Sequence, residues 1–201
     1  LMAGLEPPAR GTIHIDGQDS SGWSRRRWAQ QVSLLPQLSS LSFPLTVTEV
    51  VALGNLQSLD SVVQQRQQIQ HALTLWDINY LAQPQVLWLS GGEQHRGKLA
   101  RSWLQAHSTS FWLLDEPFSA LDLRHQHQCL LQARQEEDAG HGVVMVIHDL
   151  NLARQYADRV ALLCCGCLLA SGTPAEVMTS ERLSEVFEID VLADAGGIRW
   201  R

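Results

Sequence analysis

The sequence has no long apolar run. Of its 201 residues, 45% are hydrophobic, yet the longest apolar runs, such as Val143–Ile147, are far shorter than the roughly 20 residues that a membrane-spanning helix needs. Leu1–Arg10 has neither the basic start nor the apolar core of a secretory signal peptide. We therefore expect any work at a membrane to be done from its surface, through a partner.

Clustered positive charge is also scarce. The formal net charge is −6, and the best basic run, Arg25–Arg27, is short and typical of a solvated helix face. Proteins that bind nucleic acid through its phosphate backbone carry an extended basic surface. We therefore expect no nucleic-acid partner.

Paired metal ligands are missing as well. Cys129 stands alone, and the other three cysteines form C-C-G-C at 164–167, with no second pair to complete a zinc site. We interpret C-C-G-C as a turn between two strands in a reducing cytosol. His125 and His127 are two residues apart, so they lie on opposite sides of a helix and share no metal.

The remaining pattern alternates strands and helices and shows no internal repeat. Strands are expected at 12–15, 32–35, 111–114 and 143–147, and a closing hairpin at 160–163 and 168–170; helices are expected at 46–53, 64–76, 93–104 and 121–138, with another capped by Thr173. This order predicts an α/β fold with a mostly parallel sheet and a mostly helical insertion at about 46–108.

Residues 87–101, LWLSGGEQHRGKLAR, contain two overlapping phosphate-binding patterns. Gly92–Lys98 spells G-x-x-x-x-G-K, but a P-loop needs Ser or Thr next, and here Leu99 follows within one continuous helical stretch. The other pattern, Ser90-Gly91-Gly92-Glu93, is a capping box whose two glycines leave bare N–H groups at a helix start, where an anion binds well. Taken alone, it could be only a well-capped surface helix.

A second group of residues supports the phosphate interpretation. Residues 111–117 read FWLLDEP, an apolar strand that ends in Asp115 and Glu116. Asp115 could hold Mg²⁺ through water, and Glu116 could orient a water for attack on a phosphate. The alternative is a strand that merely ends in two acids before a proline.

In order and spacing, these motifs resemble the ATP-binding subunit of an ABC transporter. The resemblance rests on L-S-G-G-E at 89–93, L-L-D-E-P at 113–117, S-A-L-D at 119–122, His148, and Gln37 after VSLLP. It implies a P-loop NTPase-like ABC ATPase core, with a mostly parallel sheet plus a helical subdomain at about 46–108. It also implies that residues 1–201 form one nucleotide-binding domain.

The resemblance assigns roles to single residues. Asp115 is similar to the family's magnesium-binding acid and Glu116 to its catalytic base. His148 is similar to the switch histidine that contacts the γ-phosphate. Gln37 is similar to the residue that links Mg²⁺ and the attacking water to the membrane subunits.

The resemblance also implies partners. Ser90–Glu93 is similar to the signature that meets ATP bound on the opposite subunit, and Asp122 to the acid of the interface loop. Two copies would close head to tail around two ATP molecules with Mg²⁺ and drive transmembrane permease subunits. A periplasmic or surface substrate-binding protein would take part indirectly.

The family's P-loop lies upstream of every motif quoted, and LMAGLEPPARGTIHIDG at 1–17 resembles the segment that follows it. We therefore expect an N-terminally truncated domain whose 201 residues alone show weak or absent ATP turnover. Two explanations are open: the sequence is truncated at its N-terminus, or the chain is an inactive remnant.

Three further stretches resemble importers of iron chelates, haem and cobalamin, and most closely haem importer ATPases: LSFPLTVTEVVALGN at 41–55, FSALDLRHQH at 118–127 and HDLNLARQYADRV at 148–160. The resemblance implies an ATPase that drives haem uptake from the cytoplasmic face of the bacterial inner membrane, as a peripheral subunit. Import of iron siderophores or cobalamin is the alternative function. An alternative from another functional class is a soluble ABC ATPase.

Overall fold

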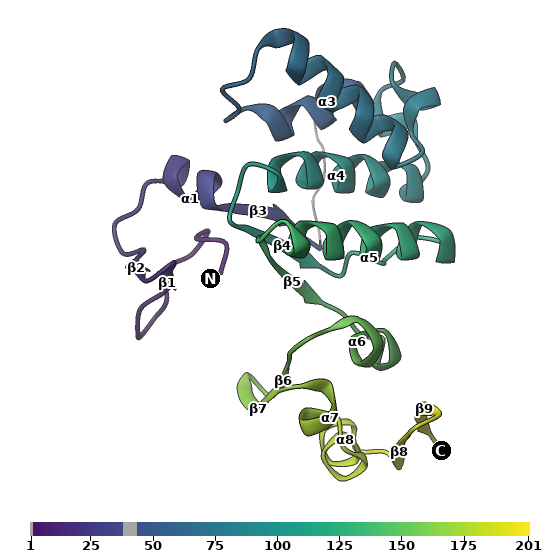
Figure 1. Cartoon of the computed structure of the whole chain (residues 1–201). Coiled ribbons are helices and arrows are strands. Elements are labelled where there is room, and N and C mark those ends of the chain that lie inside the picture. The colour runs from purple at the N-terminus through teal and green to yellow at the C-terminus, as the bar shows by residue number, and fades with distance from the viewer. Residues whose placement is uncertain (1, 38–43) are drawn as a thin grey trace. The chain divides into compact units, whose positions relative to one another are not determined.

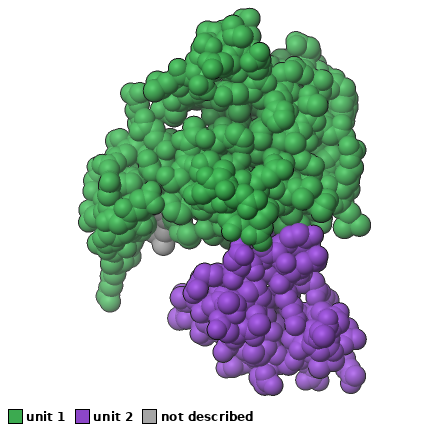
Figure 2. All heavy atoms as spheres, viewed as in Figure 1, with its two compact units in different colours: residues 1–146 green, residues 147–201 purple. Residues whose placement is uncertain are grey.

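The structure, a computed structural model, describes residues 2–37 and 44–201. It divides into two compact units, Leu1–Val146 and Ile147–Arg201 (Figure 2). Residues 41–43 of the importer-like stretch 41–55, including Phe43, lie outside the described residues. Throughout the part of the chain that is described, no helix combines the length and the apolar character that crossing a membrane would require.

The first unit is built on a three-stranded parallel sheet (Figure 1). Its strands are β3 (Val32–Leu35), β4 (Phe111–Asp115) and β5 (Gly142–Val146), in that spatial order, so β4 is central. The strands predicted from short apolar runs are confirmed, as is their parallel pairing. A small hairpin, β1 (His14–Ile15) and β2 (Gln18–Asp19), and helix α1 (Arg25–Gln31) precede the sheet.

The connection from β3 to β4 is helical. It contains α2 (Val47–Ala52), α3 (Val62–Leu75) and α4 (Gly91–Ala106), with the short 3₁₀ turns η1 (Leu53–Asn55), η2 (Asn79–Leu81) and η3 (Val86–Trp88). Capping boxes begin the three α-helices at Thr46, Ser61 and Ser90. Helix α5 (Leu123–Asp138) then joins β4 to β5. That the residues at about 46–108 form a separate subdomain stays a prediction.

Helix α4 holds this unit together. It packs against α2 and α3 on one side and against β3 and β4 on another (Figure 1). The core around it is apolar and closely buried, and its largest fully buried side chains include those of Leu35, Trp76, Leu99, Trp112 and Leu114. Burial of this apolar surface is the main force that fixes α4 on the sheet.

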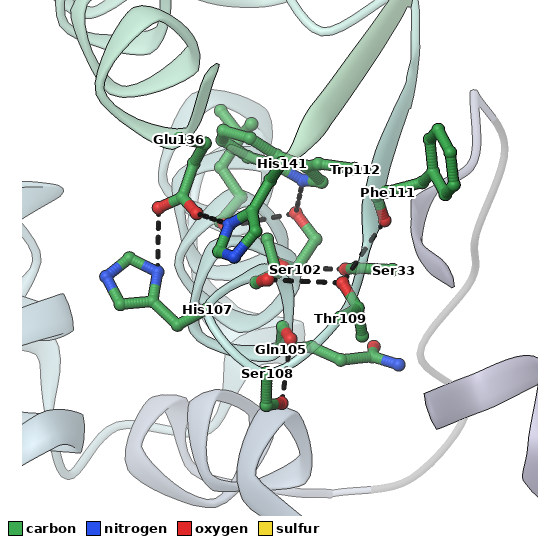
Figure 3. Close-up of polar contacts among 12 residues, drawn as sticks. Ser33, Ser102, Gln105, His107, Ser108, Thr109, Phe111, Trp112, Glu136 and His141 are labelled. Atoms are coloured by element: carbon green, nitrogen blue, oxygen red, sulfur yellow. Dashed lines mark hydrogen bonds and ion pairs between the residues drawn. The ribbon is translucent and has the colours of Figure 1, made fainter. Parts of the chain in front are cut away.

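Buried hydrogen bonds also join α4 to the sheet (Figure 3). On β3, the Ser33 hydroxyl donates to the Ser102 carbonyl of α4 at 2.7 Å. On β4, the Trp112 indole N–H donates to the Ser102 hydroxyl at 3.2 Å. Since Ser33, Ser102 and Trp112 are all fully buried, the loss of one partner would leave another polar group unsatisfied.

At the C-terminal end of α4, one buried carboxylate bonds two histidines (Figure 3). Glu136 of α5 is only 4% exposed, and its two oxygens lie 2.7 Å from Nδ1 of His107 and 2.7 Å from Nδ1 of His141. Burial alone would raise the pKa of Glu136, but hydrogen bonds from the two histidines outweigh it and hold the pKa below its usual value. The cluster ties α4, α5 and the start of β5 together.

The second unit has its own small core. It contains α6 (Leu150–Tyr156), β6 (Val160–Cys164), β7 (Cys167–Gly172), α7 (Pro174–Val177), α8 (Ser180–Phe187), β8 (Val191–Asp194) and β9 (Gly197–Trp200). The predicted hairpin is confirmed as β6–β7, and Thr173 caps α7 with Pro174 at its first position. The turn is shorter than predicted, because Cys164 and Cys167 belong to the strands.

Candidate functional site

The candidate site begins at the carboxyl ends of β3 and β4. Asp115 is the last residue of β4 and pairs with Val146 of β5. The Glu116 N–H donates to the Val146 carbonyl at 3.0 Å, which extends the pairing by one residue. Because parallel strands end at the same sheet edge, residues that follow neighbouring strands come close together.

Gln37 and Glu116 demonstrate this proximity. The Gln37 amide Nε2 donates to Glu116 Oε1 at 2.6 Å. Glu116 has a φ of +51°, a left-handed conformation that is uncommon for a non-glycine residue and costs about 1–3 kcal/mol. Ser119 supports this bend, since its N–H and its hydroxyl both donate to the Glu116 carbonyl, at 3.2 and 3.0 Å. Backbone strain of this kind is concentrated at functional sites.

The side chains here fit a hard cation only in part. Asp115 offers a half-exposed carboxylate, and Gln37 keeps its amide oxygen for a ligand because its nitrogen is bonded to Glu116. Among residues 2–37 and 44–201, no group of three or more His, Cys, Asp or Glu could hold a metal ion. Such a sparse oxygen set suits Mg²⁺, which binds through one or two protein ligands plus water and substrate phosphates.

The second element of the site is the start of α4. Ser90 caps the helix as predicted: its hydroxyl accepts from the Glu93 N–H at 3.4 Å, and Glu93 accepts in return from the Ser90 N–H at 2.9 Å. The hydrogen bond from the Ser90 hydroxyl is the main cause that lowers the pKa of Glu93. No sequence motif pointed to Tyr80, whose hydroxyl donates to Glu93 at 3.2 Å and accepts from Arg96 at 3.3 Å.

The two glycines of the signature differ in their surroundings. A Cβ on Gly91 would meet open space, whereas a Cβ on Gly92 would lie 3.0 Å from the Ala120 carbonyl oxygen. Gly92 therefore packs the start of α4 directly against the S-A-L-D segment at 119–122. The exposed Gly91 leaves the helix N-terminus open for an anion to approach.

Asp122 is the N-cap of α5. Its carboxylate accepts from the His125 N–H at 2.9 Å and lies 2.7 Å from His125 Nδ1. These bonds, with that to the backbone N–H first, lower the pKa of Asp122. The predicted role of Asp122 at an interface between two copies stays a prediction.

His148 lies in the second unit, just before α6, which Asp149 caps. Its role as a switch histidine therefore stays a prediction. A hollow of about 720 Å³ lies elsewhere, at the opposite edge of the sheet, where His107 and His141 are among its lining residues. That hollow contains none of the predicted site residues.

Comparison with known proteins identifies the family of the chain. A profile described as ABC transporter matches residues 1–119. The hemin import ATP-binding protein HmuV of Pseudomonas entomophila is 41% identical over 194 residues, covering 95% of this chain and 76% of the relative. HmuV of Plesiomonas shigelloides is 39% identical, covering 92% of this chain and 77% of the relative.

Solved structures agree on the fold. A structure of an ATP-binding subunit of an ABC transporter superposes with a TM-score of 0.79 at 23% identity, covering 88% of this chain and 72% of that one. A putative metal-chelate type ABC transporter in an inward-facing conformation superposes with a TM-score of 0.73. The chain belongs to the ABC transporter family, as an ATP-binding domain of the ABC ATPase fold.

Proposed function

We propose that this chain is the ATP-binding subunit of an ABC importer and couples ATP hydrolysis to the uptake of haem across the cytoplasmic membrane. The observation that carries the ATPase part is the 2.6 Å contact between Gln37 and Glu116 at the sheet edge beside Asp115. The haem part rests on the relatives, which are hemin import ATP-binding proteins.

In the proposed mechanism, Glu116 accepts the proton of the water that attacks the γ-phosphate. Gln37 holds the Glu116 carboxylate in place and senses the membrane subunits. Asp115 would hold Mg²⁺ through water, and the ion would neutralise charge on the phosphates. For His148 we propose contact with the γ-phosphate, as the family resemblance implies.

The signature acts on a second copy of the chain. Ser90, Gly91 and Gly92 present the positive end of the α4 dipole to ATP held by that copy. Asp122 lies along the same interface. Closure of the head-to-tail dimer around two ATP molecules moves the transmembrane permease, and the substrate-binding protein delivers cargo to that permease.

The decisive experiment uses the protein assembled with its permease in lipid vesicles. Glu116→Gln should retain ATP binding and lower both hydrolysis and haem uptake by at least ~100-fold, because an amide cannot accept the proton. Exposed Glu6 offers the matched control, and Glu6→Gln should leave both rates unchanged.

The outcomes separate the parts of the proposal. Near-normal turnover in Glu116→Gln would remove Glu116 from the role of base. ATP-driven uptake of a ferric siderophore or of cobalamin, with none of haem, would overturn the cargo and keep the ATPase. Turnover by the wild type that never responds to a permease would favour a soluble ABC ATPase.

A further inference from the structure

Three thiols gather at the tip of the β6–β7 hairpin. Cys164 ends β6, Cys167 begins β7, and Cys165-Gly166 forms the turn between them. Cys165 and Cys167 are exposed, and Cys164 is half-buried. In contrast, Cys129 on α5 is buried, and burial raises its pKa to about 12. The hairpin therefore holds the accessible thiols of the chain.

We propose that this hairpin is a thiol–disulfide exchange site, which reacts with low-molecular-weight disulfides and closes to a Cys164–Cys167 disulfide. The inference concerns the second unit alone and does not depend on the proposed transport function. It assigns chemistry to a motif, C-C-G-C, that the ATPase site leaves unused.

The strand register determines which two cysteines can form the disulfide. Cys164 and Cys167 are directly opposite partners in the antiparallel register, and such partners place their side chains on one face, with Cα atoms about 4.5–5.5 Å apart. That spacing lies within the range of about 4.4–6.8 Å found across disulfides. The pair can close without a change of register.

Cys165 is the nearest thiol but the poorer partner. Its Sγ lies 3.6 Å from that of Cys164, yet neighbouring residues have Cα atoms only about 3.8 Å apart, below the usual disulfide range. Cys165 and Gly166 have φ values of +49° and +77°, as a type I′ turn requires. This turn holds the two strands in register and keeps Cys165 outside the pair.

A resident metal does not explain the cluster. Three sulfurs that converged would form a soft-metal site, but the described part of the chain contains no group of three or more His, Cys, Asp or Glu able to hold an ion. The thiols lie side by side along a hairpin rather than around a point. Exchange between two sulfurs at a time is the chemistry that this arrangement allows.

An exposed thiol attacks the small disulfide first. The Cys164 S–H donates to the Cys165 sulfur, and this bond raises the pKa of Cys164, whereas Cys167 is exposed to a small disulfide. The Cys167 thiolate attacks a small disulfide, forms a mixed disulfide and releases one small thiolate. Cys164 then loses its proton and attacks the Cys167 sulfur, which releases the second small thiol. Two protein thiols are oxidised, and one small disulfide is reduced to two thiols.

The test titrates the purified 201-residue chain with glutathione disulfide and measures its intact mass, followed by peptide mapping. Wild type should lose the mass of two hydrogen atoms, with the bond mapped to Cys164–Cys167, and dithiothreitol should reverse this. Cys165→Ser should form the same bond. Cys164→Ser should instead retain one glutathione on Cys167.

Two results would overturn the proposal. One is a bond mapped to Cys164–Cys165 or Cys165–Cys167 in wild type. The other is a wild-type chain that carries only mixed disulfides, or none, while the thiols react fully with a small alkylating reagent. Cys129 serves as an internal control, because its buried thiol should remain unmodified until the chain is unfolded.

Discussion

The Gln37 side chain donates a 2.6 Å hydrogen bond to Glu116, across 79 residues of sequence. The bond joins the loop after β3 to the loop after β4, the central strand. The two side chains therefore hold each other in position, and a substitution at one should displace the other.

We therefore predict that Gln37→Ala lowers ATP turnover about tenfold, since a hydrogen bond to a charged group is worth about 1.5 kcal/mol. Gln37→Glu should be worse, because it sets two carboxylates against each other. Steady-state phosphate release measures both. Gln30→Ala, an exposed glutamine of α1, is the control; equal losses in Gln30→Ala and Gln37→Ala would contradict a specific role.

Ser90→Arg should spare ATP binding to the monomer and lower turnover strongly. In the proposed dimer, a bulky side chain would block the α4 N-terminus from ATP on the opposite copy and would not reach ATP held by its own subunit. Ser61→Arg is the matched control, because Ser61 caps α3 through the same kind of box. Loss of monomer ATP binding in Ser90→Arg would mean that the stretch 92–98 binds phosphate within its own subunit.

The two signature glycines should respond differently to alanine. Gly91→Ala meets open space and should keep or slightly raise thermal stability, yet lower turnover by crowding the phosphate. In Gly92→Ala the new methyl group presses on the Ala120 carbonyl. This variant should lose about 1 kcal/mol of stability and should also turn over ATP more slowly. Thermal unfolding and ATPase rates on the same preparations test this; identical effects on stability would contradict the described packing.

Glu136 should make the first unit sensitive to acid. Its folded-state pKa lies below the usual value, so its stabilisation is fully present above the unfolded pKa and is lost as pH falls through the folded pKa. Glu136→Gln should destabilise the unit by about 1–3 kcal/mol near neutral pH and flatten the acid slope. Urea unfolding from pH 7 to pH 3 measures this. Glu137→Gln, at an exposed neighbour, should retain the wild-type slope.

Local structure was predictable wherever neighbouring residues decide it. The S-x-x-E spacing predicted the cap at Ser90, and the apolar run at 111–114 predicted β4; both are confirmed. These features depend on hydrogen bonds and burial within a few residues, which the sequence displays directly.

Long-range polar contacts were not predictable in the same way. Glu136 lies in the run Glu136-Glu137-Asp138, which indicates the solvated end of a helix, and its burial depends on where β5 and the end of α4 come to lie. The Gln37–Glu116 bond likewise needs the strand order β3-β4-β5, which no single segment of sequence contains.

Helix α4 is held at several points along its length. The Ser90–Glu93 box closes its first turn, Ser33 on β3 bonds Ser102 in its C-terminal half, and His107 at its C-cap bonds Glu136. Its 16 residues span about 24 Å. Because α4 is bonded to β3 and to α5 near its C-terminal end, we expect a displacement of its first turn to be transmitted along the helix, so that a probe near His107 would register events at Ser90.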